Sequence, residues 1–339
     1  MFAKTNLFSF EEFVEMEKIL ALRILKTITG IVGILGNGLI CVVICKVSAM
    51  QTRTNAFIFH QAVVDFLGST MILVQSEIPL PDPLPDNGLG WVICNVWLSN
   101  FTLFFVFVVS TFNLLAVTME RYFAIVHPFR YQAAFVRYPR VKVGAVIVTC
   151  WLVGAAIKPY LMTIFEIREG SCRSLSGSKA VGILTAFLQY ILPVGVMFFA
   201  YIRISVELKR GAARVGPPPP GAAAPATEAA SPAEPVPPDM GMRESLLKAR
   251  RNIFKTLLTV FITFLVCWTP NQVIFLSYNL GLLDLNFKEW YYLLSVAMVA
   301  ANCCVNPFIY VAKYRHFRNG LRQMLCGNTC RSDTCTTLA

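Results

Sequence analysis

Apolar stretches of about 20 residues recur along the whole sequence, separated by short polar connections. A helix of that length crosses the hydrocarbon core of a bilayer, so the pattern predicts membrane-spanning helices rather than a soluble domain. The predicted spans lie near residues 24–46, 55–76, 95–119, 143–164, 180–202, 253–277 and 290–312. We therefore expect an all-α membrane protein that folds as a bundle of seven transmembrane helices.

The segments around these spans are more polar. After the seventh span, Tyr314, Phe317 and Leu321 recur at helical spacing with basic residues between them, which predicts a short amphipathic helix over 314–325 on the inner membrane surface. The loop between the fifth and sixth spans is rich in Pro and Ala, and we expect it to be disordered. The predicted organisation is an N-terminal segment 1–23, a bundle 24–326 that contains the loop 211–245, and a C-terminal tail 327–339.

The distribution of charge predicts how the bundle is inserted. The chain is 56% hydrophobic and 14% charged, with a net charge of +11. Most Lys and Arg residues fall in the first, third and fifth connections and in the tail, whereas the N-terminus and the other connections are slightly acidic. Because basic loops stay in the cytoplasm, we expect an extracellular N-terminus and a cytoplasmic C-terminus. The basic charge is then a topology signal and does not indicate nucleic-acid binding.

The cysteines divide according to this topology. Only Cys94 and Cys172 fall on the predicted outer side, where the oxidising environment favours a disulfide that would hold the fourth connection over the third span; two free thiols are the alternative. Cys326, Cys330 and Cys335 follow the amphipathic helix. They are candidates for palmitoylation, with unmodified cytosolic thiols as the alternative.

One carboxylate, Asp65, falls in the middle of the second span. A charge at this depth is costly, so its side chain should face the interior of the bundle. The polar side chains available to it in the third and seventh spans are Ser110, Asn113, Asn302 and Asn306. Together these groups could enclose water or a small cation, or they could form purely structural hydrogen bonds.

Two further features bear on movement and signalling. Pro193, Pro270 and Pro307 interrupt the last three spans, and each should kink its helix, so this part of the bundle could pivot.

The charge-free run Cys94–Met119 ends in Glu120-Arg121-Tyr122. Arg121 could be a functional charge at the membrane boundary, or it could be a flanking charge of the kind that ends most membrane helices. The triplet alone does not decide between these two interpretations.

Taken in order, the motifs resemble those of the rhodopsin-like family of G-protein-coupled receptors. Each motif alone is a weak signal. The motifs occur one per span, in the family's order and on the expected side of the membrane, and this makes the resemblance specific over about residues 24–326. The motifs are Asn37, Asp65, Glu120-Arg121-Tyr122, Trp151, Cys267-Trp268-Thr269-Pro270 and Asn306-Pro307-Phe308-Ile309-Tyr310. The run Ala124-Ile125-Val126-His127-Pro128 is most similar to the peptide-receptor branch.

The resemblance implies a plasma-membrane receptor, not an enzyme, that binds an extracellular ligand and activates a heterotrimeric G protein by outward movement of helix six. Arrestin and receptor kinases are further implied partners. Glu120 would hold Arg121 at rest, and Arg121 would engage the G protein in the active state. The implied activation switch comprises Glu120, Arg121, Tyr122, Tyr201, Trp268, Pro270, Asn306, Pro307 and Tyr310.

The resemblance also implies other sites. Asp65, Ser110, Asn302 and Asn306 would form a sodium and water site, and no other cofactor or metal is implied. Asn37, Trp151 and Pro193 would be structural. The implied ligand pocket contains Leu103, Phe107, Trp268 and Gln272, with Trp268 at its floor.

Two positions depart from the family pattern. Cys94 precedes Arg121 by 27 positions, two more than usual, so the third span either starts longer or carries an irregular turn at its outer end. Arg250 occupies the place of a frequent acid at the inner end of the sixth span, so the usual lock between Arg121 and that span cannot form. We therefore expect appreciable basal activity.

The sequence narrows the ligand class. Phe101–Phe107 contains no acid and the seventh span contains no lysine, which disfavours monoamines and retinal. An acidic outer surface would attract a basic or amidated peptide, although a solvated surface without a partner has the same composition. The expectation is a neuropeptide receptor; a receptor for a lipid or other small molecule is the alternative. A polytopic transporter is a remote alternative, because no inverted repeat is evident.

Overall fold

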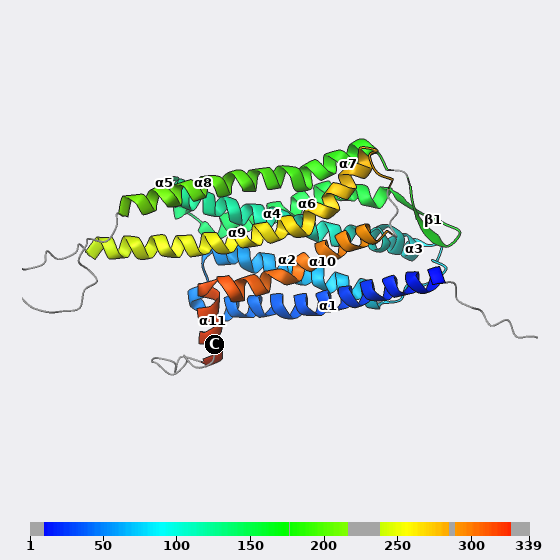
Figure 1. The fold of residues 1–339 in the computed structure, drawn as a ribbon, viewed down its shortest axis with the longest axis horizontal. Helices are drawn as coiled ribbons and strands as arrows, with labels where there is room; N and C mark the ends of the chain where they lie inside the picture. The colour runs from blue at the N-terminus through cyan, green and yellow to red at the C-terminus, as the bar shows by residue number, and fades with distance from the viewer. Residues whose placement is uncertain (1–9, 176, 216–237, 285–288, 327–339) are drawn as a thin grey trace, which may run out of the picture.

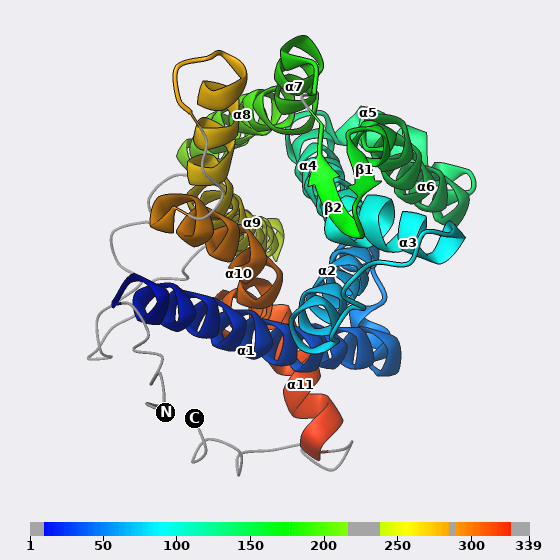
Figure 2. The ribbon, with the colours of Figure 1, turned by 90° about the vertical axis from the view of Figure 1, so that its right-hand side faces the viewer.

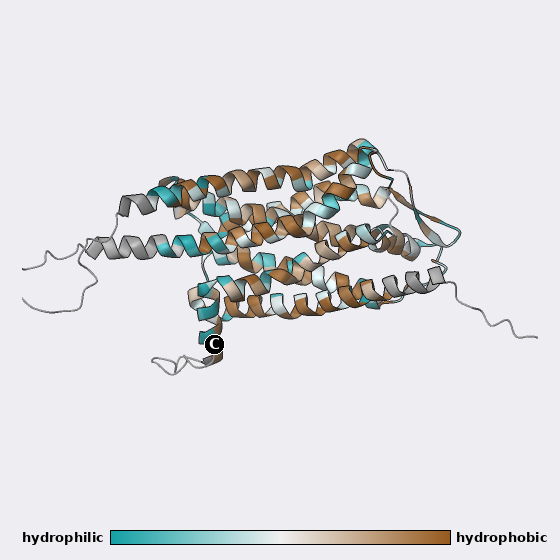
Figure 3. Ribbon diagram, viewed as in Figure 1, coloured by the Kyte–Doolittle hydropathy of each residue, from teal (hydrophilic) through white to brown (hydrophobic). Residues whose placement is uncertain are grey.

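The computed structural model describes residues 10–175, 177–215, 238–284 and 289–326, and it forms a bundle of long helices that run side by side (Figure 1). Within these residues, seven helical segments are long and apolar enough to cross a membrane, which confirms the predicted seven-span fold. Hydrophobic residues predominate along the middle of the bundle (Figure 3). The segments are Leu20–Lys46, Arg53–Glu77, Gly88–Val126, Pro139–Thr163, Lys179–Gly211, Arg250–Asn279 and Trp290–Lys313.

Four spans are formed by one helix each, and three contain a change of helix type. The single helices are α1 (Phe10–Lys46), α2 (Arg53–Glu77), α9 (Pro238–Asn279) and α10 (Trp290–Lys313). The third span consists of α3 (Gly88–Val92), a π-helical turn (Ile93–Leu98) and α4 (Phe101–Val126). The fourth and fifth consist of α6 (Pro139–Ile157) with a 3-10 turn (Pro159–Thr163), and of α7 (Lys179–Ala186), a π-helical turn (Phe187–Ile191) and α8 (Leu192–Val215).

The two ends of the bundle differ in their connections. At one end, β1 (Phe165–Arg168) and β2 (Ser171–Ser174) form an antiparallel hairpin in which Ile167 faces Cys172. Figure 2 views the bundle from this hairpin end. At the opposite end, a 3-10 turn (Ser48–Met50), α5 (Pro128–Val136) and α11 (Arg315–Cys326) connect or follow the spans, and α11 turns away from the bundle axis (Figure 1). We call this the α11 end.

The predicted disulfide is present. Cys94, in the π-helical turn of the third span, is bonded to Cys172 of β2, with the two Cα atoms 5.4 Å apart. Cys94 is fully buried and packs with Leu84 and Ile93. The bond therefore fixes the hairpin over the end of the third span, as the sequence predicted.

The two extra residues of the third span are taken up by an irregular turn rather than by a longer straight helix. The π-helical turn ends at Leu98, and Asn100 has a left-handed backbone with φ of 56° before α4 begins at Phe101. The Ser99 hydroxyl caps the break: it donates to the carbonyl of Asn95 at 2.5 Å and accepts from the amide of Phe101 at 3.1 Å. The π-helical turn and the break at Asn100 together take up the additional residues at this end of the span.

Helix α1 lies very close to both α2 and α10. A Cβ added to Gly33 would lie 2.0 Å from the Ser69 hydroxyl of α2, and one added to Gly36 would lie 2.8 Å from the Pro307 ring of α10. Asn37, predicted as structural, donates to the carbonyls of Gly33 at 2.9 Å and of Cys303 in α10 at 2.8 Å. Small residues and an interhelical amide therefore bring α1 against both neighbours.

Three helices extend beyond the predicted spans. Helix occupies 10–23 within the predicted N-terminal segment. It also occupies 211–215 and 238–245, so the expected disorder of the loop 211–245 is wrong at its two ends, because α8 and α9 continue beyond their apolar cores. The middle of the loop, the tail 327–339, Cys330 and Cys335 lie outside the described residues. Pro193, which has no amide hydrogen to donate, is the second residue of α8 and follows the π-helical turn Phe187–Ile191 by two positions, whereas Pro270 and Pro307 lie inside α9 and α10.

The amphipathic helix α11 packs against the bundle, beginning with Tyr314 directly before it. Tyr314 and Phe317 are 5% and 1% exposed, and both belong to the main hydrophobic core, whereas Leu325 is 72% exposed. The Tyr314 hydroxyl donates to Oδ1 of Asn55 at 2.7 Å, and burial raises the pKa of Tyr314 to about 12. Leu321 and Met324 pack against the same core, so several apolar residues of α11 contact the bundle and not the inner membrane surface.

Candidate functional site

The Glu120–Arg121 pair lies at the α11 end of α4. Nε of Arg121 donates to Oε2 of Glu120 at 2.5 Å, and Nη2 donates to Oε1 at 2.5 Å. The side chains are 4% and 18% exposed for Glu120 and Arg121 respectively. A two-point, charge-assisted contact of this kind is among the stronger interactions available to a carboxylate, and here it joins neighbouring residues of one helix.

Two residues that sequence reasoning missed complete this pair. Thr54, in the first turn of α2, accepts from Nη2 of Arg121 and donates to Oε2 of Glu120 at 3.4 Å. Tyr131 of α5 donates its hydroxyl to Oε1 of Glu120 at 2.5 Å, and burial together with this bond raises the pKa of Tyr131. Pro128 at the first position of a short apolar segment could have predicted α5 and hence the proximity of Tyr131.

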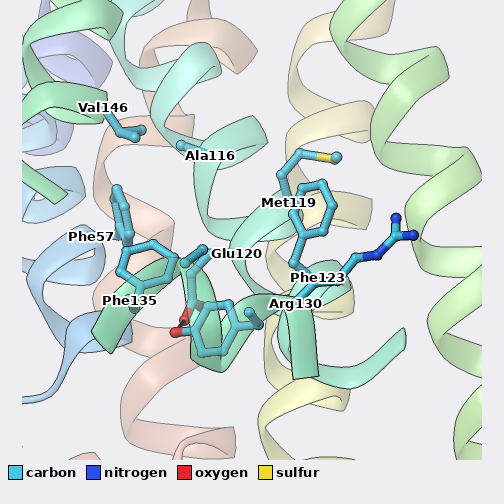
Figure 4. A pocket seen from close by; sticks show the side chains of 10 residues that line it. Phe57, Ala116, Met119, Glu120, Phe123, Arg130, Phe135 and Val146 are labelled. Atoms are coloured by element: carbon cyan, nitrogen blue, oxygen red, sulfur yellow. Dashed lines mark hydrogen bonds between the residues drawn. The ribbon is translucent and has the colours of Figure 1, made fainter. Parts of the chain in front are cut away.

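A cavity of about 360 Å³ adjoins the pair (Figure 4). Phe57 of α2 and Phe135 of α5 lie on one side of it, and Met119 and Phe123 of α4 lie on the other, with Glu120 between them. Its lining is mostly apolar; of the polar partners of Glu120, Tyr131 belongs to the lining, whereas Arg121 and Thr54 do not.

The other residues of the implied switch are dispersed. Tyr201 of α8 donates to the backbone carbonyl of Leu257 in α9 at 3.1 Å and accepts from Thr118 of α4 at 3.2 Å. Tyr310 is 3% exposed, and among the described residues no hydrogen bond joins its hydroxyl to that of Tyr201. Tyr122 turns away from Arg121, and its hydroxyl lies 3.4 Å from Nε2 of His127. In this state Tyr201 joins the fifth, sixth and third spans.

Asp65 is 1% exposed and lies at the centre of a hydrogen-bond network. Its carboxylate accepts from Nε2 of Gln61 at 3.1 and 3.2 Å, from Ser110 at 3.2 Å and from Nδ2 of Asn306 at 2.7 Å. Gln61 was not predicted, although it lies one helical turn before Asp65 and therefore on the same face. Asn302 is buried but makes no hydrogen bond to Asp65 within the described residues.

The network extends to the fourth span. Nε1 of Trp151 donates to Nε2 of His60 at 2.9 Å, so the proton on the His60 ring lies on Nδ1, which faces Oδ1 of Asn113 at 2.8 Å. Nδ2 of Asn113 donates to Oε1 of Gln61 at 2.8 Å. Trp151, predicted as structural, thus contacts the Asp65 network through α2 and α4.

The side chains around Asp65, as they stand, do not fit a bound cation. A cation needs several oxygen ligands turned towards it. Here two amide nitrogens and the Ser110 hydroxyl donate to the carboxylate and so satisfy its charge. No cluster of three His, Cys, Asp or Glu side chains that could hold a metal occurs within the described part of the chain. The sodium site that the resemblance implies would therefore require these donors to turn away from the carboxylate of Asp65.

An aromatic cluster lies nearer the hairpin end, at the predicted pocket floor. Phe107 of α4 contacts the Trp268 ring edge to face, with ring centroids 5.5 Å apart, and Phe264 lies 5.8 Å from the same ring. Trp268 is 5% exposed, and its Nε1 has no hydrogen-bond partner among the described residues. Leu103 packs at the edge of the same core. Rotation of Trp268 would therefore break packing but no hydrogen bond.

Gln272 lies one turn beyond Trp268 on α9 and is 5% exposed. Its Oε1 accepts from Nε2 of Gln189, at 3.4 Å. Gln189 in turn accepts from Nζ of Lys158 at 2.5 Å. Lys158 and Gln189 are further residues of the predicted pocket region that sequence reasoning missed; the signal was a lysine within the apolar run of the fourth span.

Arginines already pair several acids at the hairpin end. Arg23 contacts Glu77 at 2.8 Å, Arg168 pairs with Glu166, and Arg173 lies 3.3 Å from Glu169. The surface is therefore less acidic than the count of carboxylates suggests, and the predicted attraction for a basic peptide is weaker.

The ordered motifs and the seven-helix fold agree with comparison to known proteins. Residues 36–310 match the family of 7 transmembrane receptors of the rhodopsin family, so the chain belongs to this family, whose members are receptors rather than enzymes. The chain is 26% identical to the RYamide receptor of Drosophila melanogaster, over 87% of this chain and 61% of that protein. It is 28% identical to galanin receptor 2b of Danio rerio, over 87% and 72%. It is 26% identical to somatostatin receptor type 5 of Bos taurus, over 87% and 73%.

Proposed function

We propose that the protein is a plasma-membrane receptor for a neuropeptide and that it activates a heterotrimeric G protein when α9 moves outward. The observation that carries the proposal is the buried Glu120–Arg121 pair at one end of a bundle whose other end holds the Trp268 cluster. The peptide class is supported by the similar proteins, which are named as receptors for RYamide, galanin and somatostatin.

The proposed orientation places the hairpin end outside the cell and the α11 end in the cytoplasm. The Cys94–Cys172 disulfide supports this orientation, because such bonds persist in oxidising compartments. The excess of basic residues in the connections at the α11 end supports it independently. A peptide would then approach the hairpin end, and the G protein would approach Arg121.

The coupling between the two ends runs through α9. Repacking of Trp268 by a bound peptide would bias α9, because Pro270, two residues away, lacks a backbone N–H and makes the helix easier to bend at this point. Outward movement would break the bond between Tyr201 and the Leu257 carbonyl, and the contact of Thr256 with the Lys313 carbonyl at 3.3 Å. A shift from about 1% to about 99% active requires roughly 10⁴-fold preferential binding, or about 5.5 kcal/mol.

The test is a ligand screen in cells that express the receptor. A panel of neuropeptides, including RYamide, galanin and somatostatin peptides, is compared with a panel of lipids, and GTPγS exchange is measured in membranes. We expect a peptide to increase exchange in the wild type and not in Arg121→Ala at equal surface expression. A response to lipids alone would overturn the peptide proposal in favour of the alternative class, and a response that survives Arg121→Ala would overturn the assigned role of Arg121.

The same cells test the remaining partners. We propose that arrestin and receptor kinases act on the active receptor, and that Cys326 at the end of α11 and Cys330 are palmitoylated. Agonist should recruit labelled arrestin to the membrane, and an acyl-exchange assay should label the wild type but not Cys326→Ser with Cys330→Ser. Arrestin that stays cytosolic, or equal labelling of both proteins, would contradict these assignments.

A further inference from the structure

A lysine is buried near the hairpin end without a carboxylate partner. Lys158 follows the last residue of α6 and is only 5% exposed, so its ammonium group does not extend to solvent. Among the described residues, no Asp or Glu lies within ion-pair distance of it. A buried charge without a counter-charge is strongly unfavourable, and within a membrane-spanning segment it indicates a function.

The groups around Lys158 satisfy its ammonium only in part. Nζ donates one hydrogen bond, to Oε1 of Gln189 at 2.5 Å, and lies 5.2 Å from the ring centroid of Phe104. An ammonium group has three N–H donors, so one amide oxygen and one aromatic ring leave donor capacity unused.

Lys158 is connected to the Trp268 cluster by two routes. Gln189 donates to Gln272, which lies one helical turn beyond Trp268 on α9. Phe104 contacts Phe107 with ring centroids 6.2 Å apart, and Phe107 contacts Trp268 at 5.5 Å. A group bound at Lys158 would therefore touch the fourth, fifth and sixth spans beside the aromatic floor.

We propose that Lys158 binds a carboxylate of the ligand, carried next to an aromatic or aliphatic group that packs on Phe104 and Phe107. The carboxylate would accept from Nζ of Lys158 and from an amide of Gln189 or Gln272, and it would supply the missing counter-charge. This inference rests on the proposed function because it places the anion beside the Trp268 cluster. It limits the candidate peptides to those with a free C-terminus or an acidic side chain next to an apolar one.

The direct test uses a small probe in place of the unidentified peptide. Purified receptor is heated with N-acetylphenylalanine or with its uncharged amide, at equal millimolar concentration and equal ionic strength. We expect the acid, and not the amide, to raise the melting midpoint of the wild type by about 2 °C or more at saturation. The rise should vanish in Lys158→Gln and persist in Lys179→Gln, a matched change of an exposed lysine in α7.

Each other outcome of this experiment counts against the inference. Equal shifts with acid and amide, no shift with either, or a shift that survives Lys158→Gln would overturn it.

A second measurement distinguishes a lysine that binds the ligand from a lysine that stabilises the fold. In the empty receptor, Lys158→Met removes an unpaired charge but keeps a long apolar side chain, so its melting midpoint should equal or exceed that of the wild type. A fall of about 5 °C or more would show that Lys158 supports the fold and would overturn the inference.

The two proposals can fail separately. If no peptide activates the receptor while the acid probe still stabilises it through Lys158, the neuropeptide proposal fails and the anion site stands. If a peptide activates the wild type and Lys158→Gln with equal potency, the anion site fails and the neuropeptide proposal stands.

Discussion

Glu120 links three elements through one carboxylate. It accepts from Arg121 in its own helix, from Thr54 of α2 and from Tyr131 of α5. Within the described part of the chain, no residue of α9 forms a hydrogen bond or ion pair with Arg121. The restraint on Arg121 therefore lies on the side of the second and third spans, away from the helix proposed to move.

Glu120→Gln should raise basal signalling. The change removes the negative charge that holds Arg121 and costs the resting state about 1–2 kcal/mol, which is a factor of about 5–30 in the equilibrium between states. Agonist-independent GTPγS exchange at matched surface expression measures it. A rate no higher than that of the wild type would show that Glu120 is not the restraint.

Tyr131→Phe isolates one of the three contacts. It removes a single hydroxyl donor to Glu120 and keeps the ring, so the expected effect is about 0.5–1.5 kcal/mol and basal exchange should rise less than in Glu120→Gln. Phe135→Leu, which changes the neighbouring ring but no hydrogen bond to Glu120, is the control. Equal rates in wild type and Tyr131→Phe would remove α5 from the restraint.

Gln61 occupies the position beside Asp65 where a cation would need room and oxygen ligands. We propose that the wild type responds little to sodium and that Gln61→Leu exposes the carboxylate and gains a response. The melting midpoint in NaCl should then exceed that in choline chloride for Gln61→Leu only. A clear sodium effect in the wild type would mean that the amides of Gln61 and Asn306 turn away when sodium binds.

At the scale of elements, the contact between α1 and α2 depends on glycine, which has no side chain. The Ser69 hydroxyl already fills the space next to Gly33, whereas a Cβ at Gly144 of α6 would meet nothing within 4 Å. Both glycines lie in membrane-spanning helices, but Gly33 is crowded by a neighbouring helix and Gly144 is not. Substitution of each by the same residue therefore measures the effect of the helix contact.

Gly33→Val should destabilise the purified receptor by about 1–3 kcal/mol, because the added side chain forces α1 from α2. Gly144→Val should stay within about 0.5 kcal/mol of the wild type. Thermal unfolding in detergent compares the two. A similar loss in both variants would mean that general properties of valine, and not the contact with Ser69, cause the effect.

The sequence predicted those elements that depend on composition and local order. Hydropathy located the spans, and topology singled out Cys94 and Cys172, because membrane insertion imposes both constraints on the chain directly. The sequence placed the two extra residues at the outer end of the third span but did not decide between a longer helix and an irregular turn, since the spacing of Cys94 and Arg121 is the same in both. Lys158 was overlooked although a lone cation in an apolar run is visible in the sequence; its isolation from carboxylates, which gives it meaning, depends on three other helices.

At the scale of the whole molecule, the absence of a lock to α9 predicts basal activity. Signalling in transfected cells should exceed that in mock-transfected cells, and equal signalling would contradict this. Arg250→Glu places an acid at the inner end of the sixth span and should lower basal exchange several-fold. Arg251→Glu makes the same charge change about 100° around the helix and is the control. Equal effects of the two changes would indicate a general response to charge at the α11 end.

The hydrogen bonds that lead from Trp151 to Asp65 all point the same way. Trp151 donates to His60, His60 to Asn113, Asn113 to Gln61, and Gln61 to the carboxylate. Bonds arranged head to tail polarise one another, so each gains strength from the negative charge at the end of the row. The indole of Trp151 in α6 is thus linked by four hydrogen bonds to the carboxylate of Asp65 in the adjacent α2. We therefore expect a change of charge at Asp65 to shift the ultraviolet absorption and emission of Trp151, an optical signal that a Trp151→Phe variant would lack.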